Sequence, residues 1–495
     1  MKYISTRGQS APLTASQAII KGLADDGGLY VPEFLPALSA AELASLPEKT
    51  YHEMAGLVLG RLLDDFSAAE LAECLSAAYA PPAFEDNEPA KIVALDDRTA
   101  LLELWHGPTC AFKDMALQLM PRLFMLSLKK NGISGRAVML AATSGDTGKA
   151  ALEGFRDLPG LSAAVLYPYG GVSEIQRLQM TTQRGDNVSV AAVRGNFDDT
   201  QNAVKRIFGD AAFRQSLADG GYFLTSANSI NWGRLAPQIV YYFYACARLQ
   251  AAGTLKPGDL LDVCVPTGNF GNILAGFYAR CMGAPIGRLI CASNRNNVLT
   301  EFIQTGRYDR NRPFYQTLSP SMDILISSNL ERLLFALCRQ DAATVADLMQ
   351  QLSESGQYTV SDALRRGIQA IFAAGFCDDA GTLAEIGRVW RQYGYLLDPH
   401  TAVASAVLRA ADFPDDRPRL IVSTASPFKF APQVAGAIGL AGAGEGLDAL
   451  GNLSAASGLP VPRSLSELGG LPERHRGLLA PDEIANWLLE TLAQP

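Results

Sequence analysis

The chain of 495 residues is predicted to fold as an α/β protein, with two domains built on parallel sheets and an added N-terminal domain that is mainly helical. Two observations predict this class. From about residue 93 onward, apolar runs are followed by glycine-rich turns and then by helical patterns, which is typical of parallel strands covered by helices. Before that point, helical periodicity dominates. Ligands of such folds bind at the carboxyl ends of the strands.

Residues 1–92 form the predicted N-terminal domain. Leu, Ala and Glu recur at helical spacing through residues 40–71, and residues 22–32 are expected to form a tight turn that enters a short strand. A loop rich in proline and acidic residues, 81–89, closes this domain.

The remaining chain divides into a large domain in two parts, 93–130 and 225–440, a small α/β domain, 131–224, and a C-terminal extension, 441–495. Helices are expected at residues 149–155, 273–281 and 481–492, and residues 328–410 are expected to be largely helical. The predicted strands are residues 100–105, 137–143, 161–168, 188–193, 260–266, 289–292 and 419–424.

Composition restricts the possible partners. Hydrophobic residues make up 48% of the chain and charged residues 19%, as in ordinary globular proteins. The net charge is −8, and no run of Lys or Arg exceeds a pair, so we expect neither nucleic-acid nor membrane binding. The cysteines are scattered without CxxC pairs, and no signal-peptide or membrane-spanning pattern is present, which predicts a cytoplasmic protein.

Lys113 is the central candidate residue. It stands where the predicted strand 100–105 gives way to a helix that begins near Met115. An amine at the start of a helix feels the positive end of the helix dipole, and burial would make it easier still to deprotonate, as a nucleophilic lysine requires. On this segment alone, a solvated lysine in a first helical turn is the alternative.

Two loops that follow predicted strands offer anion sites. Residues 267–272 open a helix directly after a strand, so their backbone amides can hold a phosphate, or they form a plain tight turn. Residues 143–148 have the same placement and add hydroxyl groups. Asp146 within this second loop is unfavourable beside an anion unless it faces a cation, and it can instead cap the following helix.

Two further segments are weaker candidates. Residues 225–234 gather hydroxyls, amides and Arg234 before an apolar helix, which suits a phosphate monoester, or they form a capping loop with a surface arginine. Thr424 ends a predicted strand and can point a hydroxyl into a cleft. The four histidines lack metal-ligand spacing, so no metal site is expected, and no GxSxG motif supports a serine hydrolase.

Taken together, these motifs resemble the threonine synthase family, which are pyridoxal-phosphate enzymes with the fold of the tryptophan synthase β-chain (fold type II). Four loops carry the resemblance, and three further segments agree in order and spacing. They are residues 106–114, 142–148, 265–272 and 423–430, with 5–8 and 27–32, 319–323, and 398–401. The match runs from about residue 3 to residue 430.

The resemblance implies roles for individual residues. Lys113 would form the Schiff base with pyridoxal 5'-phosphate and shuttle protons at the substrate carbons. Thr424 would meet the pyridine nitrogen of the cofactor. The cofactor phosphate would rest on Gly268, Asn269, Phe270, Gly271 and Asn272. The residues expected to contact substrate are Thr143, Ser144, Asp146, Thr147, Asn228, Ser229, Asn231 and Arg234.

The reaction implied is the conversion of O-phospho-L-homoserine and water to L-threonine and phosphate, by γ-elimination and β-addition, in a monomer or homodimer. The alternative is a related phospholyase that releases 2-oxobutyrate, ammonia and phosphate. The chain departs from many family members at two positions: Ser426 replaces a histidine, and Cys110 replaces an aliphatic residue as an expected packing change.

Overall fold

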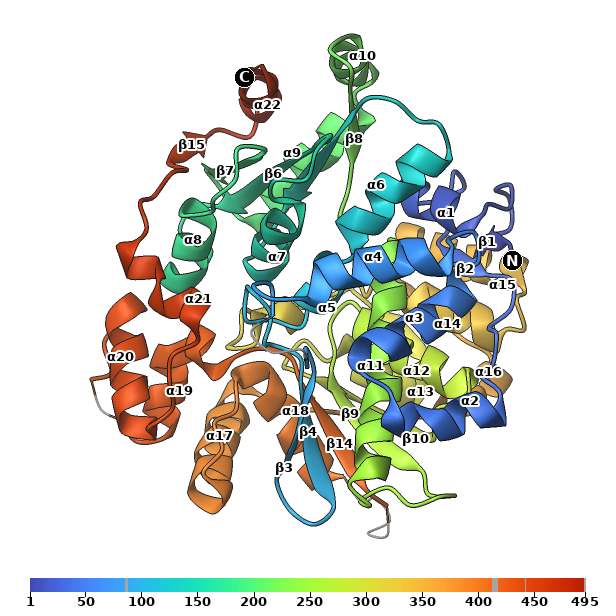
Figure 1. Ribbon diagram of the computed structural model, residues 1–495, viewed down its shortest axis with the longest axis vertical. Helices are drawn as coiled ribbons and strands as arrows, with labels where there is room; N and C mark the ends of the chain where they lie inside the picture. Colours follow the sequence, from blue (N-terminus) through green and yellow to red (C-terminus); the bar gives the residue numbers. More distant parts are fainter. Residues whose placement is uncertain (85–87, 412–416, 441, 494–495) are drawn as a thin grey trace.

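The computed structural model describes residues 1–84, 88–411, 417–440 and 442–493. Figure 1 shows two sheets, one above the other, with the N-terminal helices beside the lower sheet and the C-terminal segment running up the opposite side. Residues 85–87 of the predicted closing loop lie outside the described residues.

The N-terminal segment folds into helices and one small sheet. β1 (Tyr3–Ser5) pairs antiparallel with β2 (Tyr30–Pro32), which confirms a strand at the end of the turn 22–32. In each of the four helices, a Ser or Thr side chain caps the first turn and a Glu or Gln bonds back to it, which fixes where the helix begins. These helices are α1 (Ala15–Lys21), α2 (Ala40–Ser45), α3 (Tyr51–Leu62) and α4 (Ala68–Tyr79).

This segment shares its core with the rest of the molecule. α3 packs against the long helix α11 (Trp232–Ala251), where the rings of Tyr51 and Tyr244 lie 5.2 Å apart. The ring of Tyr3 in β1 lies 5.3 Å from that of Trp232. The N-terminal residues therefore support the element that carries the 225–234 loop.

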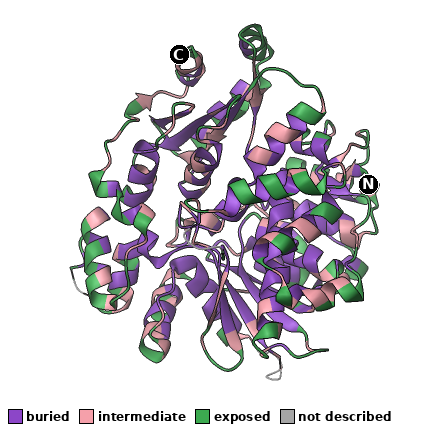
Figure 2. Cartoon of the chain, viewed as in Figure 1, coloured by how far each residue is buried: buried purple, intermediate pink, exposed green. Residues whose placement is uncertain are grey.

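The lower sheet has six strands in the order β13-β10-β9-β14-β4-β3, and all pairs except β3 with β4 are parallel. Its central strands are almost completely buried, as Figure 2 shows. The loops after β4, β9 and β14 therefore emerge at one edge. The strands are β3 (Lys91–Ala94), β4 (Thr99–Glu103), β9 (Leu261–Pro266), β10 (Ile286–Ser293), β13 (Phe372–Phe376) and β14 (Arg419–Ser423).

The upper sheet has five parallel strands in the order β15-β7-β6-β5-β8. Its edge strand β15 comes from the C-terminal segment and pairs with the end of β7. The strands are β5 (Arg136–Ala142), β6 (Leu161–Pro168), β7 (Val188–Val193), β8 (Tyr222–Thr225) and β15 (Gly477–Leu479). The accompanying helices are α7 (Asp146–Phe155), α8 (Glu174–Thr181), α9 (Phe197–Gly209), α10 (Ala211–Asp219) and α22 (Ile484–Leu492).

The remaining helices surround the lower sheet and connect the two layers. Residues 328–410 are mostly helical, as expected, but they also contain β12 (Gln357–Thr359), which pairs with β11 (Arg307–Asp309), and β13. The helices not yet given are α5 (Asp114–Leu117), α6 (Met120–Lys130), α12 (Gly271–Cys281), α13 (Val298–Thr305), α14 (Leu330–Leu337), α15 (Ala342–Ser355), α16 (Asp362–Gln369), α17 (Asp379–Tyr393), α18 (Pro399–Ala410), α19 (Ala431–Ala437), α20 (Gly446–Ser457) and α21 (Arg463–Ser466).

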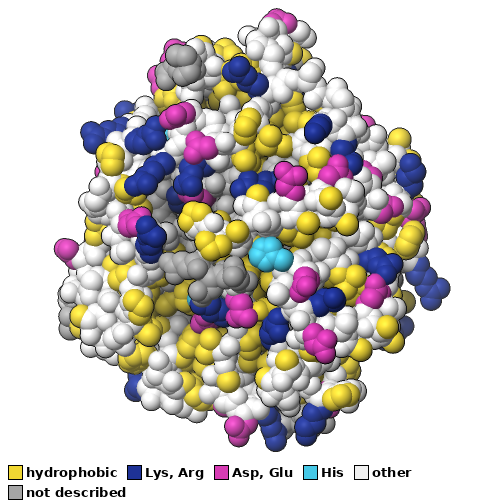
Figure 3. Space-filling model, viewed as in Figure 1, with side chains coloured by type: hydrophobic (Ala, Val, Ile, Leu, Met, Phe, Trp, Pro, Cys, Tyr) yellow, Lys and Arg dark blue, Asp and Glu magenta, His cyan; other side chains and the backbone are white. Residues whose placement is uncertain are grey.

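Charged groups of both signs are interspersed over the face of the molecule that Figure 3 shows. Within the described part of the chain, none of the helices combines the length and the apolar character that crossing a bilayer requires.

Candidate active site

Lys113 is buried at the junction of the two sheets' loops and is not a solvated surface lysine. Only 9% of the residue is exposed, and it occupies the N-cap position of α5. Its Nζ donates to Ser321 Oγ at 2.8 Å and lies 3.5 Å from Asp146 Oδ2. Burial lowers the pKa of the Lys113 amine, and Lys429 and Arg234 lower it further, against the opposing charge of Asp146.

The end of β14 fixes the backbone that leads to Lys113. Phe112 N donates to Thr424 O at 2.8 Å, and Ser426 N donates to Cys110 O at 3.1 Å. These bonds bring the backbone of Thr424 next to the lysine segment. Cys110 is buried with a left-handed φ of 57°, and the hydroxyl of Ser426 accepts from Phe428 N at the start of a short 3-10 helix.

The loop 267–272 links β9 to α12, and Phe270 makes the turn with a left-handed φ of 63°. Gly268 packs so closely against the segment 320–322 that a Cβ there would lie 2.6 Å from Ser321 O. Since Ser321 also accepts the hydrogen bond from Lys113, the same short segment contacts the loop and the lysine. Ser327 Oγ donates to Gly268 O and Asn329 Nδ2 to Asn269 O, at 2.8 and 3.0 Å, which holds the loop from behind.

Asn272 leaves an unused donor in this loop. Its Oδ1 accepts from the hydroxyls of Tyr241 and Tyr242, each at 2.7 Å. Its buried Nδ2 has no hydrogen-bond partner among the described residues. A buried amide nitrogen without an acceptor is unfavourable, so the site favours a ligand that carries acceptor oxygens, such as a phosphate.

Asp146 binds cations and does not cap α7, because the N-cap is Gly145. Its Oδ1 lies 2.6 Å from Lys429 Nζ and accepts from Gln176 Nε2 at 3.1 Å. Burial opposes ionisation of Asp146, but Lys429 and Lys113 outweigh it and hold the pKa of the carboxyl well below its usual range.

Of the other residues of the loop 143–148, one holds the loop together and two are accessible from outside it. The hydroxyl of Thr143 accepts from Gly145 N and Gly148 N at 3.0 and 2.9 Å, so it closes the loop. Ser144 is exposed and Thr147 is half-buried. Their side chains are therefore the ones in this loop that a ligand can reach.

The 225–234 segment caps α11, as one interpretation of its sequence predicts, but its arginine is not on the surface. Asn231 caps α11 through Gly233 N at 2.8 Å and donates to Ile19 O at 2.9 Å, so its side chain is engaged within the protein. Arg234 is buried, not on the surface, and burial lowers its pKa to about 10. One guanidinium nitrogen donates to Ala227 O at 2.7 Å, and Nε has no partner among the described residues.

Asn228 and Ser229 lie at the rim of the same segment. Asn228 is exposed, and Ser229 Oγ lies 3.2 Å from Ser328 Oγ, beside the loop 327–329 that supports residues 267–272. The two predicted anion loops and the 225–234 segment are thus connected through residues 319–329.

Three residues at this site were not predicted as site residues: Ser321, His400 and Lys429. His400 Nδ1 lies 2.9 Å from Asp398 Oδ1, and its Nε2 accepts from Ser321 N at 3.2 Å, which orients the serine toward Lys113. The sequence carried a signal for all three, since residues 319–323, 398–401 and 423–430 belong to the matching motifs. Among the residues that the structure describes, no cluster of His, Cys, Asp or Glu could hold a metal ion.

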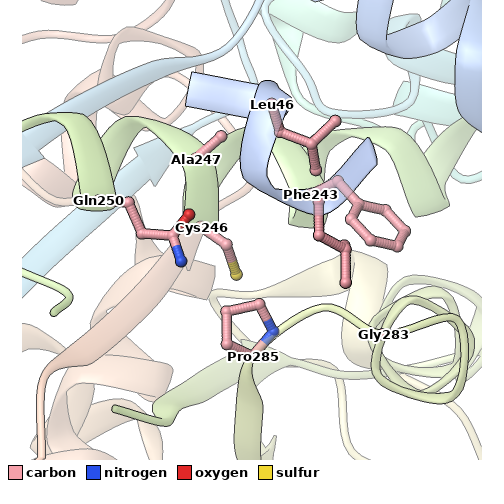
Figure 4. Close-up of a pocket in the computed structure, with 8 residues that line it drawn as sticks. Leu46, Phe243, Cys246, Ala247, Gln250, Gly283 and Pro285 are labelled. Carbon is pink, nitrogen blue, oxygen red and sulfur yellow. The ribbon is translucent and has the colours of Figure 1, made fainter. Parts of the chain in front are cut away.

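A separate apolar cavity of about 140 Å³ lies between α11 and the loop before β10, as Figure 4 shows. Burial raises the pKa of its one thiol, Cys246, to about 12, which disfavours the reactive thiolate form. This cavity therefore offers no chemistry comparable to that around Lys113.

The buried lysine, the amide-lined loop and the parallel sheets define the class of pyridoxal-phosphate-dependent enzymes of fold type II. The family model described as "Pyridoxal-phosphate dependent enzyme" matches residues 99–425, and the one described as "Threonine synthase N terminus" matches residues 2–79. The chain is similar over its whole length to the PLP-bound threonine synthase from Brucella melitensis, with a TM-score of 0.90, 39% identity and coverage of 100% of both chains.

Two curated relatives indicate the family to which the chain belongs within this class of enzymes. Threonine synthase of Pseudomonas aeruginosa is 42% identical over 87% of this chain and 89% of its own length. Threonine synthase-like 1 of Homo sapiens is 44% identical over 86% of this chain, but the chain spans only 58% of that protein. The chain belongs to the threonine synthase family.

Proposed function

We propose that the protein converts O-phospho-L-homoserine and water to L-threonine and phosphate. One observation carries this proposal: the buried amine of Lys113 bonds to Ser321, which packs against the loop 267–272, and the Asn272 side chain of that loop holds a buried donor without an acceptor. Membership of the threonine synthase family supports the substrate assignment.

The residues present fit pyridoxal 5'-phosphate. The backbone of residues 268–272 and the unused Nδ2 of Asn272 would hold its phosphate at the start of α12, where the helix dipole favours an anion. Thr424 would lie at its pyridine nitrogen. When bound, this cofactor supplies the conjugation that stabilises negative charge at the substrate carbons.

Lys113 is assigned the proton transfers. Its lowered pKa makes the neutral amine more accessible near neutral pH, as a general base requires. Ser321 and Asp146 orient the amine, so that it can remove a proton from one substrate carbon and return it to the next. Water then adds at the β-carbon.

Arg234, Asn228 and Ser229 are assigned to the substrate phosphate. The unpaired Nε of Arg234 supports this role, because a buried guanidinium with a free donor favours an anionic partner. Thr143 shapes the loop over which the substrate carboxylate would lie, and Ser144 and Thr147 would bind that carboxylate. Asn231 contributes by capping α11.

The product and the fate of isotopic oxygen test the reaction. With O-phospho-L-homoserine in oxygen-labelled water, we expect threonine with label in its hydroxyl group and unlabelled phosphate, because the carbon–oxygen bond breaks. Labelled phosphate with homoserine would indicate a phosphatase, and 2-oxobutyrate with ammonia a phospholyase; either result would contradict the proposal. The Lys113→Ala variant is the control and should form no threonine.

The remaining expectations concern the location, the oligomeric state and the partners of the protein. We propose a cytoplasmic location, which is supported by the cysteines, since five of the eight are buried. We propose a monomer or homodimer as the oligomeric state. The charge distribution gives no support to a nucleic-acid partner.

A further inference from the structure

Lys429 is completely buried beside the site, although nothing in the proposed reaction uses it. Its side chain has 0% exposure, and its ammonium lies 2.6 Å from Asp146 Oδ1 and donates to Thr109 O at 3.0 Å. A buried ammonium is costly unless it is paired and hydrogen-bonded. Its position therefore depends on the Asp146 carboxylate.

Asp146 is shared between two lysines. Oδ1 faces Lys429 closely, whereas Oδ2 lies 3.5 Å from Lys113 and also accepts from Ser321 Oγ at 3.3 Å. The carboxylate is thus bound more tightly to the lysine that takes no part in the chemistry. Lys113 therefore faces the negative charge of Asp146 together with the positive charges of Lys429 and Arg234, which leaves it little net electrostatic attraction for a proton.

We propose that Lys429 is a positioning residue that acts on Lys113 through Asp146: its ammonium engages the carboxylate, so that Lys113 remains available as a free amine. The assignment rests on the proposed function only in taking Lys113 as the cofactor-binding lysine. It predicts that the affinity of Lys113 for protons follows the net charge of the two neighbouring residues.

The charged groups around this cluster come from several elements. Besides each other, Lys113 and Asp146 face Arg234 from α11 and His400 from α18. Asp114 on α5 lies within electrostatic range of Lys429. All of these groups stay unchanged in the variants below, so differences among the variants report on positions 146 and 429.

Three variants separate charge from packing. Lys429→Met removes the positive charge and leaves Asp146 to Lys113 alone. Asp146→Asn removes the negative charge and keeps an amide oxygen for Gln176. The double variant removes both charges and restores the original net charge around Lys113. Lys149→Met is the matched control, because Lys149 also pairs with a carboxylate on α7, at 3.1 Å from Glu153.

The readout is the pH dependence of cofactor recapture by the stripped full-length protein, since only the neutral amine of Lys113 reacts with the aldehyde. We expect the pH at which recapture is half-maximal to rise by about one unit in Lys429→Met, because a positive charge near Lys113 is lost. It should fall in Asp146→Asn, because a negative charge is lost. The double variant and Lys149→Met should stay close to the wild type. The proposal would be overturned if Lys429→Met and the wild type had the same midpoint. It would also be overturned if recapture did not depend on pH in either protein.

Stability gives a second readout that does not involve the cofactor reaction. Each single variant leaves a buried charge with fewer partners, so each should unfold at a lower urea concentration, and the double variant should lose less than the sum. Additive losses would contradict the shared-carboxylate arrangement. If Lys429→Met alone is insoluble, a soluble double variant with a normal midpoint supports the proposal, and an insoluble double variant contradicts it.

The two proposals fail separately. A wild type that forms no threonine but shows the expected order of midpoints would refute the proposed reaction and keep the role of Lys429. Normal threonine formation with an unshifted midpoint in Lys429→Met would do the reverse.

Discussion

Gly268→Ala is the sharpest steric test of the cofactor loop. Gly268 has an ordinary backbone conformation, so alanine is disfavoured only by space: its Cβ would lie 2.6 Å from Ser321 O and 3.1 Å from Met322 Cα. Both contacts are with backbone, which cannot turn aside as a long side chain can. The segment 320–322 must therefore shift, and Ser321 moves with it away from Lys113.

The free-energy cost of Gly268→Ala follows from the steric overlap of its Cβ with residues 321 and 322. Forcing one methyl group into a packed site typically costs about 1–3 kcal/mol. If the cofactor-free protein relaxes this strain and the bound form cannot, cofactor affinity falls by about tenfold or more, since about 1.4 kcal/mol corresponds to tenfold.

Equilibrium dialysis of the cofactor and urea unfolding measure the two effects. Gly451→Ala in α20 is the control, because no atom lies within 4 Å of its added Cβ. We expect that control to keep its cofactor affinity and to gain about 0.5–1 kcal/mol in stability. Unchanged cofactor affinity and unfolding free energy in Gly268→Ala would refute the close packing of the loop on residues 320–322.

Three further outcomes are expected. Arg234→Met should raise the KM for O-phospho-L-homoserine by about 10-fold to 100-fold, because a charge-assisted bond is lost, without loss of cofactor; an unchanged KM would exclude Arg234 from the phosphate site. Glu331→Gln should lower the unfolding free energy by about 2 kcal/mol, because Arg7 binds this carboxylate with two bonds of 3.0 Å; equal stability in urea would contradict that. Burial raises the pKa of Asp114 to about 6, so the folded protein holds this proton more tightly than the unfolded chain does. The free energy of unfolding should therefore fall by about 3 kcal/mol as the pH rises from about 4 to about 6. Asp114→Asn should remove that part of the slope, and an identical slope in urea titrations would contradict the assignment.

The longer buried strands could be predicted from sequence because their pattern is local. β6 and β7 coincide with the predicted strands 161–168 and 188–193, which are apolar apart from Ser162 and Ser189. The short strands β3, β8 and β15 could not be predicted, since each has at most four residues and is only partly buried. β15 depends on pairing with β7, nearly 300 residues earlier, and no local signal reports such a contact.

The same distinction applies to the site. Lys113 and the loops 143–148 and 267–272 could be located because each stands at the boundary between a strand and a helix. The role of Lys429 could not be predicted, although the residue lies in the motif 423–430, because a lysine after proline and phenylalanine looks exposed until Asp146 is placed beside it. Asn231 suggested a ligand contact, yet its side chain caps α11, since polar residues in such loops serve either purpose.

The most direct test of the central claim is the covalent position of the cofactor. The purified protein is treated with borohydride, which makes the bond between cofactor and lysine permanent, and is then digested and mapped by mass spectrometry. We predict that the cofactor mass is found on the peptide containing Lys113 and that the visible absorbance band disappears on reduction. Cofactor mass on Lys429 or another lysine, or on none, would contradict the account.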